Sequence, residues 1–446
     1  MKKLMSLLNR LLYAIKRKGF FIFLAQLAQF FLAVPTSMMI ILIYPFFKIR
    51  LIKLYTSRIG QYGSNTHLML CALISNDFPE EKKCLHLYYS YDDVPISNVF
   101  FHKMWKRAIP IVPFGALSSC VDRILILVFK KKYKTPFKSM FESSLGGHDH
   151  WDYFLKYDKK QFINFSKKEK NKGEELLNKI GIPSGMPFVC LLVRDEKYLK
   201  TRMPNSDDWQ YNRYRDASIE NYIPAIEFLT RSGFYVVRMG KEVGSALNLN
   251  NTKFIDYANH NLRSDFMDVF LSANCYFFVS TSCGIDCIPQ IFYRPLITTN
   301  SIICDTRSYE NWFFTIPKNV ICKKTNKLVS YKEIYCDYQH FFLSGKYAGQ
   351  DSRRIMFSEW KKKGFEFIEN TPDEILGVVK EMVAFMNNSF VQTLEMKEKQ
   401  RLFWRNFPAP LALNKSSYEN IKMKISPSFL KKHANLMTEK STCEID

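Results

Sequence analysis

The chain has 446 residues, and its 64 lysines and arginines against 42 acids give a formal net charge of +22. The length fits two or three domains, and the 47% apolar and 24% charged fractions exclude a disordered chain, a fibrous repeat and a polytopic transporter. The charge favours an anionic partner: nucleic acid, anionic lipid or a phosphorylated substrate. Eleven cysteines without a C-x-x-C pair favour a reducing compartment over a disulfide framework.

The N-terminal region combines basic charge with apolar sequence. Ten lysines and arginines precede the first acid, Asp77, and the stretch from Gly19 to Phe47 carries no charge. Apolar residues at helical spacing predict an amphipathic helix over 2–18. The uncharged run could span a bilayer, but prolines and glutamines interrupt it, so we favour an interfacial or re-entrant segment over a single span. We predict a membrane-associating segment over 1–49, which places the protein peripherally or monotopically on the cytoplasmic side of the inner membrane.

Residues 50–180 predict a first α/β domain. Short apolar runs indicate strands at 50–54, 84–89 and 109–113, and helical stretches lie at 66–74 and 98–107. A glycine-containing loop is expected at 57–65 and a polar linker at 146–170. Ser166 and Glu169 have the spacing of a capping box, which predicts a helix that ends near Gly181.

Residues 181–390 predict a second α/β domain with clearer boundaries. The expected strands lie at 187–193, 234–239, 254–255, 276–280, 295–299 and 365–368. They alternate with expected helices, which lie at 218–231, 265–272 and 372–386. Such alternation predicts a doubly wound parallel sheet. A helical C-terminal tail is expected over 391–446.

Candidate binding residues follow three of the predicted strands. Arg194 and Asp195 follow the first strand, Arg238, Gly240 and Lys241 the second, and the run Ser280–Gly284 a later one. Ligands of doubly wound sheets bind beyond the carboxyl ends of the strands. Arginine binds phosphate in a bidentate manner, and a small-residue turn before a helix offers backbone N–H groups to phosphate oxygens. Taken singly, the turn reads as a helix cap and the arginines as ion-pair partners; together they favour a nucleotide ligand.

Other catalytic motifs are absent from the sequence. It contains no P-loop, no G-x-G-x-x-G, no H-E-x-x-H and no G-x-S-x-G. His148 and His150 flank Asp149, an arrangement that suits metal ligands, a general base or a solvated loop. Asp207 and Asp208 are read as a turn.

Several blocks of this sequence together resemble a known family. The dense blocks are Val193–Leu199, Arg215–Ile226, Gly233–Lys241, Ile255–Ala258, Arg263–Asp268 and Phe278–Gly284, and weaker ones are Arg58–Gly60, Phe165–Pro183, Asn370–Met386 and Phe403-Trp404. They resemble a family of bacterial glycosyltransferases encoded among surface-polysaccharide genes and, more loosely, fucosyltransferases with two Rossmann domains. The family motif at Arg58–Gly60 often continues with His, where this chain has Gln61.

The resemblance implies a GT-B architecture of two Rossmann-like domains, with the acceptor domain first and the nucleotide-sugar domain second. The C-terminal tail would cross back to the first domain, and no metal would be required. The donor would be held by Arg194, Arg238, Gly240, Lys241, Asp256, Ser264, Asp265, Ser280, Thr281, Ser282 and Gly284. Arg194, Arg238 and Lys241 would neutralise the phosphates, and Asp256 or Asp265 would bind the ribose or the base. The general base for the acceptor hydroxyl stays open between His148, Asp149 and Asp195.

We therefore expect a glycosyltransferase that moves a sugar from a nucleotide-sugar donor to a surface-polysaccharide or lipid-linked glycan at an anionic membrane surface. The alternative is a non-catalytic membrane-bound protein that binds nucleic acid or anionic lipid. It explains the charge but not the strand-end groups, and no nucleic-acid motif is present, so no nucleic-acid partner is expected. Another transfer reaction, such as phosphoryl or pyruvyl transfer, suits the same fold.

Overall fold

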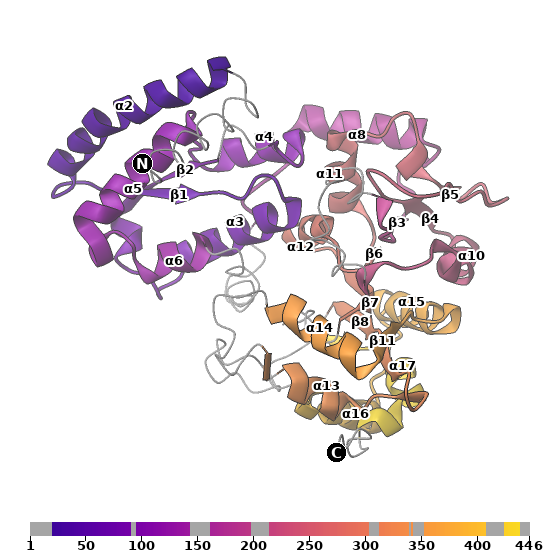
Figure 1. The fold of residues 1–446 in the computed structure, drawn as a ribbon. Coiled ribbons are helices and arrows are strands. Elements are labelled where there is room, and N and C mark those ends of the chain that lie inside the picture. The colour runs from indigo at the N-terminus through magenta and orange to yellow at the C-terminus, as the bar shows by residue number, and fades with distance from the viewer. Residues whose placement is uncertain are drawn as a thin grey trace. The chain divides into compact units, whose positions relative to one another are not determined.

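The computed structural model describes residues 20–90, 95–142, 161–197, 214–302, 312–338, 340–341, 352–406 and 423–437. The protein has a mixed α/β fold with a large parallel sheet, and it divides into two compact units, residues 1–164 and 165–446 (Figure 1). No helix within the described ranges is long and apolar enough to cross a membrane. The expected helix at 2–18 and most of the expected linker, with His148, Asp149 and His150, lie outside those ranges.

The first unit is built on a small parallel sheet. Strands β1 (Lys48–Lys53) and β2 (Cys84–Tyr89) pair in parallel, and Ile111 adds a single bridge to Tyr88. The predicted strands at 50–54 and 84–89 are confirmed, whereas the one at 109–113 is reduced to that bridge. The α-helices within the described residues of this unit are α2 (Phe20–Ile43), α3 (Ile59–Ile74), α4 (Val99–Ala108), α5 (Gly115–Phe129) and α6 (Pro136–Glu142).

Two local expectations for the first unit are wrong. The expected loop at 57–65 belongs largely to α3, because Tyr62, Gly63 and the residues that follow are buried there, and packing overrides the low helix propensity of glycine. Helix α2 continues through Pro35, although proline lacks the amide that a helix interior uses. Helix α2 packs against α5, and this packing stabilises α2 independently of the helix propensity of its residues.

A buried polar network joins α5 and α6 to β1. The Lys138 ammonium lies 3.0 Å from Oδ1 of Asp122 and also donates to the carbonyl of Leu51. Asp122 accepts hydrogen bonds from the hydroxyls of Tyr133 (2.9 Å) and Tyr89 (3.2 Å). The network satisfies a charge pair that would be costly to bury alone, and so it fixes how these elements pack.

The second unit contains a seven-stranded, wholly parallel sheet in the order β12-β8-β7-β6-β3-β4-β5. Its strands are β3 (Phe188–Leu192), β4 (Tyr235–Arg238), β5 (Phe254–Ile255), β6 (Phe278–Ser280), β7 (Leu296–Ser301), β8 (Phe313–Pro317) and β12 (Lys424–Ile425). The chain moves from β3 towards one edge and then returns to place β6 on the other side of β3. This order confirms the predicted doubly wound sheet and sets its switch point between β3 and β6.

Helices cover both faces of this sheet. Helices α10 (Ile223–Arg231) and α15 (Pro372–Met386) pack together on one face. On the other face lie α8 (Lys167–Lys179), α11 (Asp265–Asn274) and α12 (Cys287–Ile291) (Figure 1). The predicted capping box is confirmed at the start of α8, with Ser166 and Glu169, and a second capping box, Thr371 with Glu374, begins the predicted helix α15.

A second, antiparallel sheet accompanies the large one. Strand β11 (Phe365–Ile368), predicted as a strand of the parallel sheet, pairs instead with β9 (Asn319–Cys322), which also pairs with β10 (Lys327–Leu328). Helices α13 (Tyr331–Tyr338) and α14 (Ser352–Lys363) accompany these strands. Glu366 and Phe367 of β11 thereby face the region beyond the large sheet that forms the site below.

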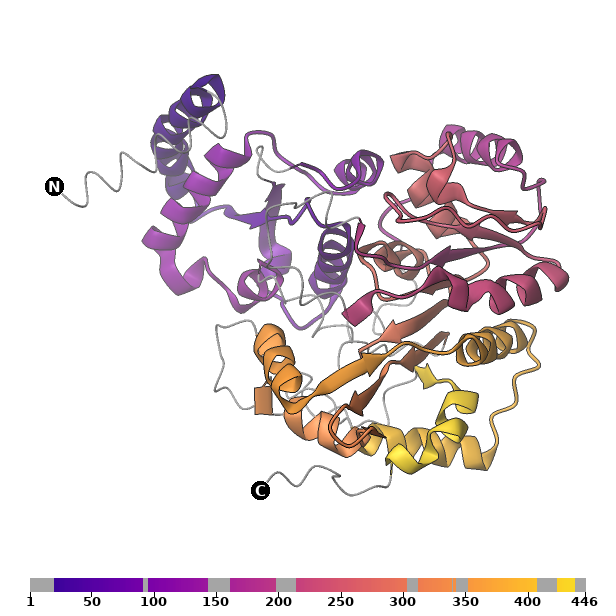
Figure 2. The same ribbon diagram turned by 45° about the vertical axis from the view of Figure 1, so that its right-hand side comes forward.

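The described part of the C-terminal tail belongs to the second unit. Strand β12 extends the large sheet beside β8, and α17 (Pro427–Lys432) packs on α15 and α16 (Leu394–Asn406) (Figure 2). The imidazole of His433 lies 2.8 Å from the Glu374 carboxylate at the start of α15. The return of the tail to the first domain, which the resemblance implies, stays a prediction.

Candidate functional site

The switch point brings together residues that follow β3 and β6. The backbone amide of Arg194, two residues after β3, donates to the hydroxyl of Thr281 at 2.9 Å. The amide of Thr281 in turn donates to the carbonyl of Leu192 at 3.2 Å. These two bonds fix the predicted basic residue beside the predicted small-residue turn, so Arg194 and Thr281 do lie together as the strand-end argument expected.

The turn after β6 has a strained backbone. Ser282 has a φ of 61°, a left-handed conformation that is uncommon for residues other than glycine, asparagine and aspartate. Such residues persist where the surrounding structure holds them, and they cluster at functional sites. Here the carbonyl of Ser282 accepts a hydrogen bond at 3.2 Å from the guanidinium of Arg215, which ties the turn to a second arginine.

The prediction that the whole turn offers free amides needs correction. The Thr281 amide is used by Leu192, and the Cys283 amide donates to the Asp286 carboxylate at 2.8 Å. The amides of Ser282 and Gly284 have no partner in the part of the chain that the structure describes. The helix that follows is also short: one turn of 3-10 helix, Gly284–Asp286, and then the five residues of α12. Arg194 and Arg215, rather than the backbone amides of a helix N-terminus, therefore supply most of the positive charge beside the turn after β6.

Two guanidinium groups lie close enough here to affect each other. Burial lowers the pKa of Arg194, and the neighbouring charge of Arg215 lowers it further. Asp216 offsets part of this repulsion, because its Oδ1 lies 3.2 Å from Nε of Arg194. Burial raises the pKa of Asp216 to about 6, against the opposite effect of Arg194, Lys318 and Arg215. The switch point thus holds a cluster of partly buried charges with an excess of cations immediately around one carboxyl group.

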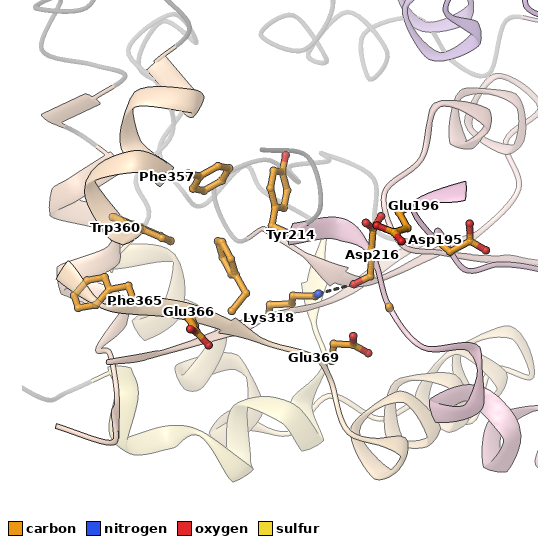
Figure 3. Close-up of a pocket in the computed structure, with 12 residues that line it drawn as sticks. Asp195, Glu196, Tyr214, Asp216, Lys318, Phe357, Trp360, Phe365, Glu366 and Glu369 are labelled. Atoms are coloured by element: carbon orange, nitrogen blue, oxygen red, sulfur yellow. Dashed lines mark hydrogen bonds between the residues drawn. The ribbon is translucent and has the colours of Figure 1, made fainter. Parts of the chain in front are cut away.

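Lys318 adds a third cation at the end of β8. Its ammonium donates to the carbonyl of Asp216 at 2.7 Å, and burial lowers its pKa, with Glu369 and Asp216 acting in the opposite direction (Figure 3). Glu369 follows β11 and accepts from the amide of Ser218 at 2.9 Å. Residues after β3, β8 and β11 therefore converge on one region.

A cavity of about 620 Å³ opens at this convergence, lined by Asp195, Glu196, Tyr214, Asp216, Ala217, Lys318, Phe357, Trp360, Phe365, Glu366, Phe367 and Glu369. Aromatic rings form one wall: the Tyr214 and Phe357 centroids are 4.7 Å apart, and those of Trp360 and Phe367 are 5.5 Å apart. In Figure 3, Phe357 and Trp360 extend towards Tyr214, and the carboxylates of Asp195 and Asp216 lie on the other side. An apolar wall facing several carboxylates suits a flat or polyhydroxylated ligand.

Other predicted site residues form oppositely charged pairs near β4. The side chain of Arg238 is 3% exposed; it donates to the Ser245 carbonyl at 2.8 Å and lies 3.3 Å from Oδ2 of Asp256. Lys241 lies 3.7 Å from the carboxylate of Asp265. The predicted phosphate-binding residues Arg238 and Lys241 are thus paired with Asp256 and Asp265, the predicted ribose- or base-binding acids. The hydrogen bond from Arg238 to the Ser245 carbonyl gives this arginine a structural role.

Three more predicted residues have evident local contacts. Asp195 accepts from the Gly244 amide at 2.7 Å and the Lys197 amide at 2.9 Å, which anchors the loop after β4 to the edge of the cavity. The Ser264 hydroxyl caps α11 by accepting from the amide of Met267 at 3.2 Å. A side chain at Gly240 would meet Val243 at 2.6 Å, so close packing of this loop accounts for the glycine.

The sequence analysis missed Arg215, Asp216, Lys318, Glu369 and the aromatic wall as site residues. Lys318 had a usable signal, because it follows the apolar run Phe313–Ile316, but no strand was predicted there. Arg215 and Asp216 follow no predicted strand, so the strand-end argument could not find them. Apart from Tyr214, the aromatic wall comes from α14 and β11, which the linear sequence gives no reason to place beside β3. Among the described residues, no group of three or more histidine, cysteine or acidic side chains could hold a metal ion.

Comparisons with known proteins give only remote likenesses. No protein-family model matches the sequence, and no curated protein matches it. Similar solved structures include E. coli ADP-heptose lps heptosyltransferase II, at 15% identity over 56% of this chain and 84% of that one, with a TM-score of 0.29. A glycosyl transferase family 9 protein from Veillonella parvula DSM 2008 has 9% identity over 70% and 96% (TM-score 0.32). E. coli heptosyltransferase WaaC with ADP has 14% identity over 60% and 90% (TM-score 0.27).

Proposed function

We propose that the protein is a glycosyltransferase that binds the diphosphate or monophosphate of a nucleotide-sugar donor at the switch point of its second unit. One observation carries the proposal: Arg194 and Arg215 both bond to the turn after β6, through the Arg194 amide to Thr281 and the Arg215 guanidinium to the Ser282 carbonyl, at the switch point where doubly wound sheets bind their ligands. The two like charges repel each other, Asp216 offsets part of this repulsion, and a bound anion would offset more of it. Phosphate also matches the forked donor geometry of arginine.

The cavity beside these arginines suits the rest of such a donor. Aromatic faces stack on a sugar or a base, and the carboxylates of Asp195, Glu366 and Glu369 accept hydrogen bonds from hydroxyl groups. As the bond to the sugar breaks, charge grows on the leaving phosphate. Arg194, Arg215 and Lys318 would stabilise that charge from fixed positions, which is the kind of interaction that accelerates a reaction.

The resemblance supports the finer parts of this proposal. They are a GT-B architecture, a metal-independent reaction, and a surface-polysaccharide or lipid-linked acceptor at the cytoplasmic membrane face. His148 and Asp149 stay predictions for the general base. The non-catalytic alternative explains the net charge of the chain, but it gives no reason for two adjacent arginines beside a carboxylate-lined cavity.

Donor turnover tests the proposed activity. Nucleotide sugars of the UDP, GDP, ADP, CMP and dTDP classes would be incubated with the purified chain, with water as the acceptor of the sugar, and release of the free nucleotide by this hydrolysis would be followed. We expect one class to be turned over, and Arg215→Ala to lower kcat/KM roughly 10- to 100-fold, because a hydrogen bond to a charged group contributes about 1.5–3 kcal/mol. Arg231→Ala is the control, since it removes the same charge from an exposed site on α10. No turnover by folded protein, or equal loss in both variants, would contradict the proposal.

Among the described acids we assign the general base to Asp216. Its pKa of about 6 lies close to the operating pH, which favours proton transfer in the transition state, and its carboxyl group lines the cavity. We expect wild-type kcat/KM to rise as the pH passes through about 6, because only the ionised carboxylate accepts a proton.

Asp216→Asn should lose about 100- to 10,000-fold in kcat, whereas Asp195→Asn should keep the rise near pH 6. The measurement is the pH profile of donor turnover for the three proteins. The assignment to Asp216 fails if its Asn variant stays active and still shows that rise, or if Asp195→Asn abolishes it.

A further inference from the structure

The first unit presents an apolar face that the described part of the chain does not cover. Met39, Leu42, Phe46 and Phe47, in α2 and the turn after it, are 68%, 74%, 83% and 70% exposed. Leu127 of α5 is 73% exposed, and α5 packs directly against α2. Single exposed apolar residues are ordinary, but a set on two packed helices and the turn between α2 and β1 marks an interaction surface.

Basic residues lie at one end of this face. Lys130, Lys131 and Lys132 directly follow α5 and are exposed, as is Lys134. Tyr44 holds this segment beside the turn that carries the two phenylalanines: its ring stacks on Phe129 at 4.0 Å, and its hydroxyl donates to the carbonyl of Lys132 at 3.4 Å. Arg50 donates to the same carbonyl at 3.0 Å. The exposed rings and the exposed lysines are therefore parts of one surface.

Within the segments that form this surface, basic residues far outnumber acids. Residues 20–53 and 114–138 contain a single acid, Asp122, and it is buried against Lys138. Among the described residues, the exposed Glu80 pairs with Lys48, at 3.4 Å, and equally with Lys83, whereas Lys130, Lys131 and Lys132 form no ion pair. A partner for this surface must therefore supply both an apolar layer and a dense negative charge.

We propose that this face, formed by α2, the turn Tyr44–Phe47, α5 and Lys130–Lys132, docks on an anionic lipid bilayer. The apolar side chains would enter the boundary between head groups and acyl chains, and the lysines would contact the anionic head groups. A bilayer offers both chemistries in one plane, with aromatic rings at the interface. The inference is independent of the proposed transferase activity, because it concerns residues of the first unit alone.

Vesicle flotation of the full chain tests this docking. The vesicles would be phosphatidylcholine alone, or phosphatidylcholine with 30% phosphatidylglycerol, at low and high salt. The Gln variant of Lys130, Lys131 and Lys132 should bind the anionic vesicles roughly 100-fold more weakly, at about fivefold for each lysine, and the loss should shrink at high salt. The matched control replaces three exposed lysines of α8, Lys167, Lys168 and Lys170, by glutamine and should bind like the wild type.

The apolar part of the surface has its own variant. Replacing Phe46 and Phe47 by serine should weaken binding at least tenfold at both salt concentrations, because hydrophobic contacts are not screened by salt. Both rings are exposed, so the variant is expected to fold, which circular dichroism would check. Docking is refuted if the wild type does not float with anionic vesicles, or if both variants bind as the α8 control does. Docking is also refuted if the wild type binds no vesicles but forms a dimer in sedimentation, and if the replacement of Phe46 and Phe47 abolishes that dimer.

Discussion

Burial determines how single acids behave around the turn after β6. The carboxylate of Asp286 accepts the Cys283 amide at 2.8 Å, and burial raises its pKa to about 7, against the effects of Ser280, that amide and Arg215. Burial likewise raises the pKa of Asp268, on α11, to about 6. At these two carboxyl groups the folded chain therefore binds more protons than the unfolded chain between about pH 4, the ordinary aspartate value, and pH 7. The contribution of these two groups to the free energy of unfolding should fall as the pH rises through this window.

Asp286→Asn isolates this effect at one residue. The amide oxygen still accepts from Cys283, but the group no longer ionises, so the free energy of unfolding should fall less steeply from pH 4.5 to 7.5 than in the wild type. Urea unfolding at several pH values measures it. Asp373→Asn, the same change at an exposed residue of α15, should keep the wild-type slope. An Asp286→Asn slope equal to that of the wild type would show that burial of this carboxyl group does not govern the pH response.

Elements with a local signal were predictable from the sequence. The capping boxes of α8 and α15 and the strands β3, β4 and β6 follow from short-range chemistry: side-chain oxygens at the N-cap and apolar runs of strand length. The second half of α3 was predicted as the helical stretch 66–74, but its glycine-containing first turns were not, because they are helical only where packing buries them. The sheet assigned to β11 was also wrong, since a strand signal of only four residues does not encode which strand it pairs with.

Helix α15 offers a test of a local signal within its tertiary setting. Thr371 accepts from the amide of Glu374 at 3.3 Å, and Glu374 accepts from the amide of Thr371 at 3.0 Å. Burial alone would raise the pKa of Glu374, but hydrogen bonds from His433, Lys432 and the Thr371 backbone outweigh this effect and lower the pKa to about 2. Thr371→Ala should lower the free energy of unfolding by about 1 kcal/mol. Thr252→Ala, in an exposed loop, should change it by less than about 0.5 kcal/mol. Equal effects of the two changes would show that the cap contributes nothing.

At the scale of the whole molecule, sequence order and spatial order diverge, and the candidate site depends on that difference. Arg194 lies far from Ser282 and Lys318 in the sequence, but the order of a doubly wound sheet places β3 beside β6 and brings β8 to the same edge. Strand-end reasoning therefore predicted Arg194 and the turn after β6. It could not predict Arg215 or the rings of α14, because these depend on connections between the strands and on the antiparallel sheet.

The most direct test of the central claim is the binding of nucleotides to the switch point. Calorimetric titration of the full chain with UDP, GDP, ADP, CDP, CMP and dTDP would be repeated with Arg194→Ala, Arg215→Ala and the control Arg231→Ala. We predict that one nucleotide class binds the wild type and the control equally, and that each switch-point variant binds it roughly 10- to 100-fold more weakly. If no nucleotide binds the folded wild type, or if all three variants bind alike, the donor is not held between β3 and β6.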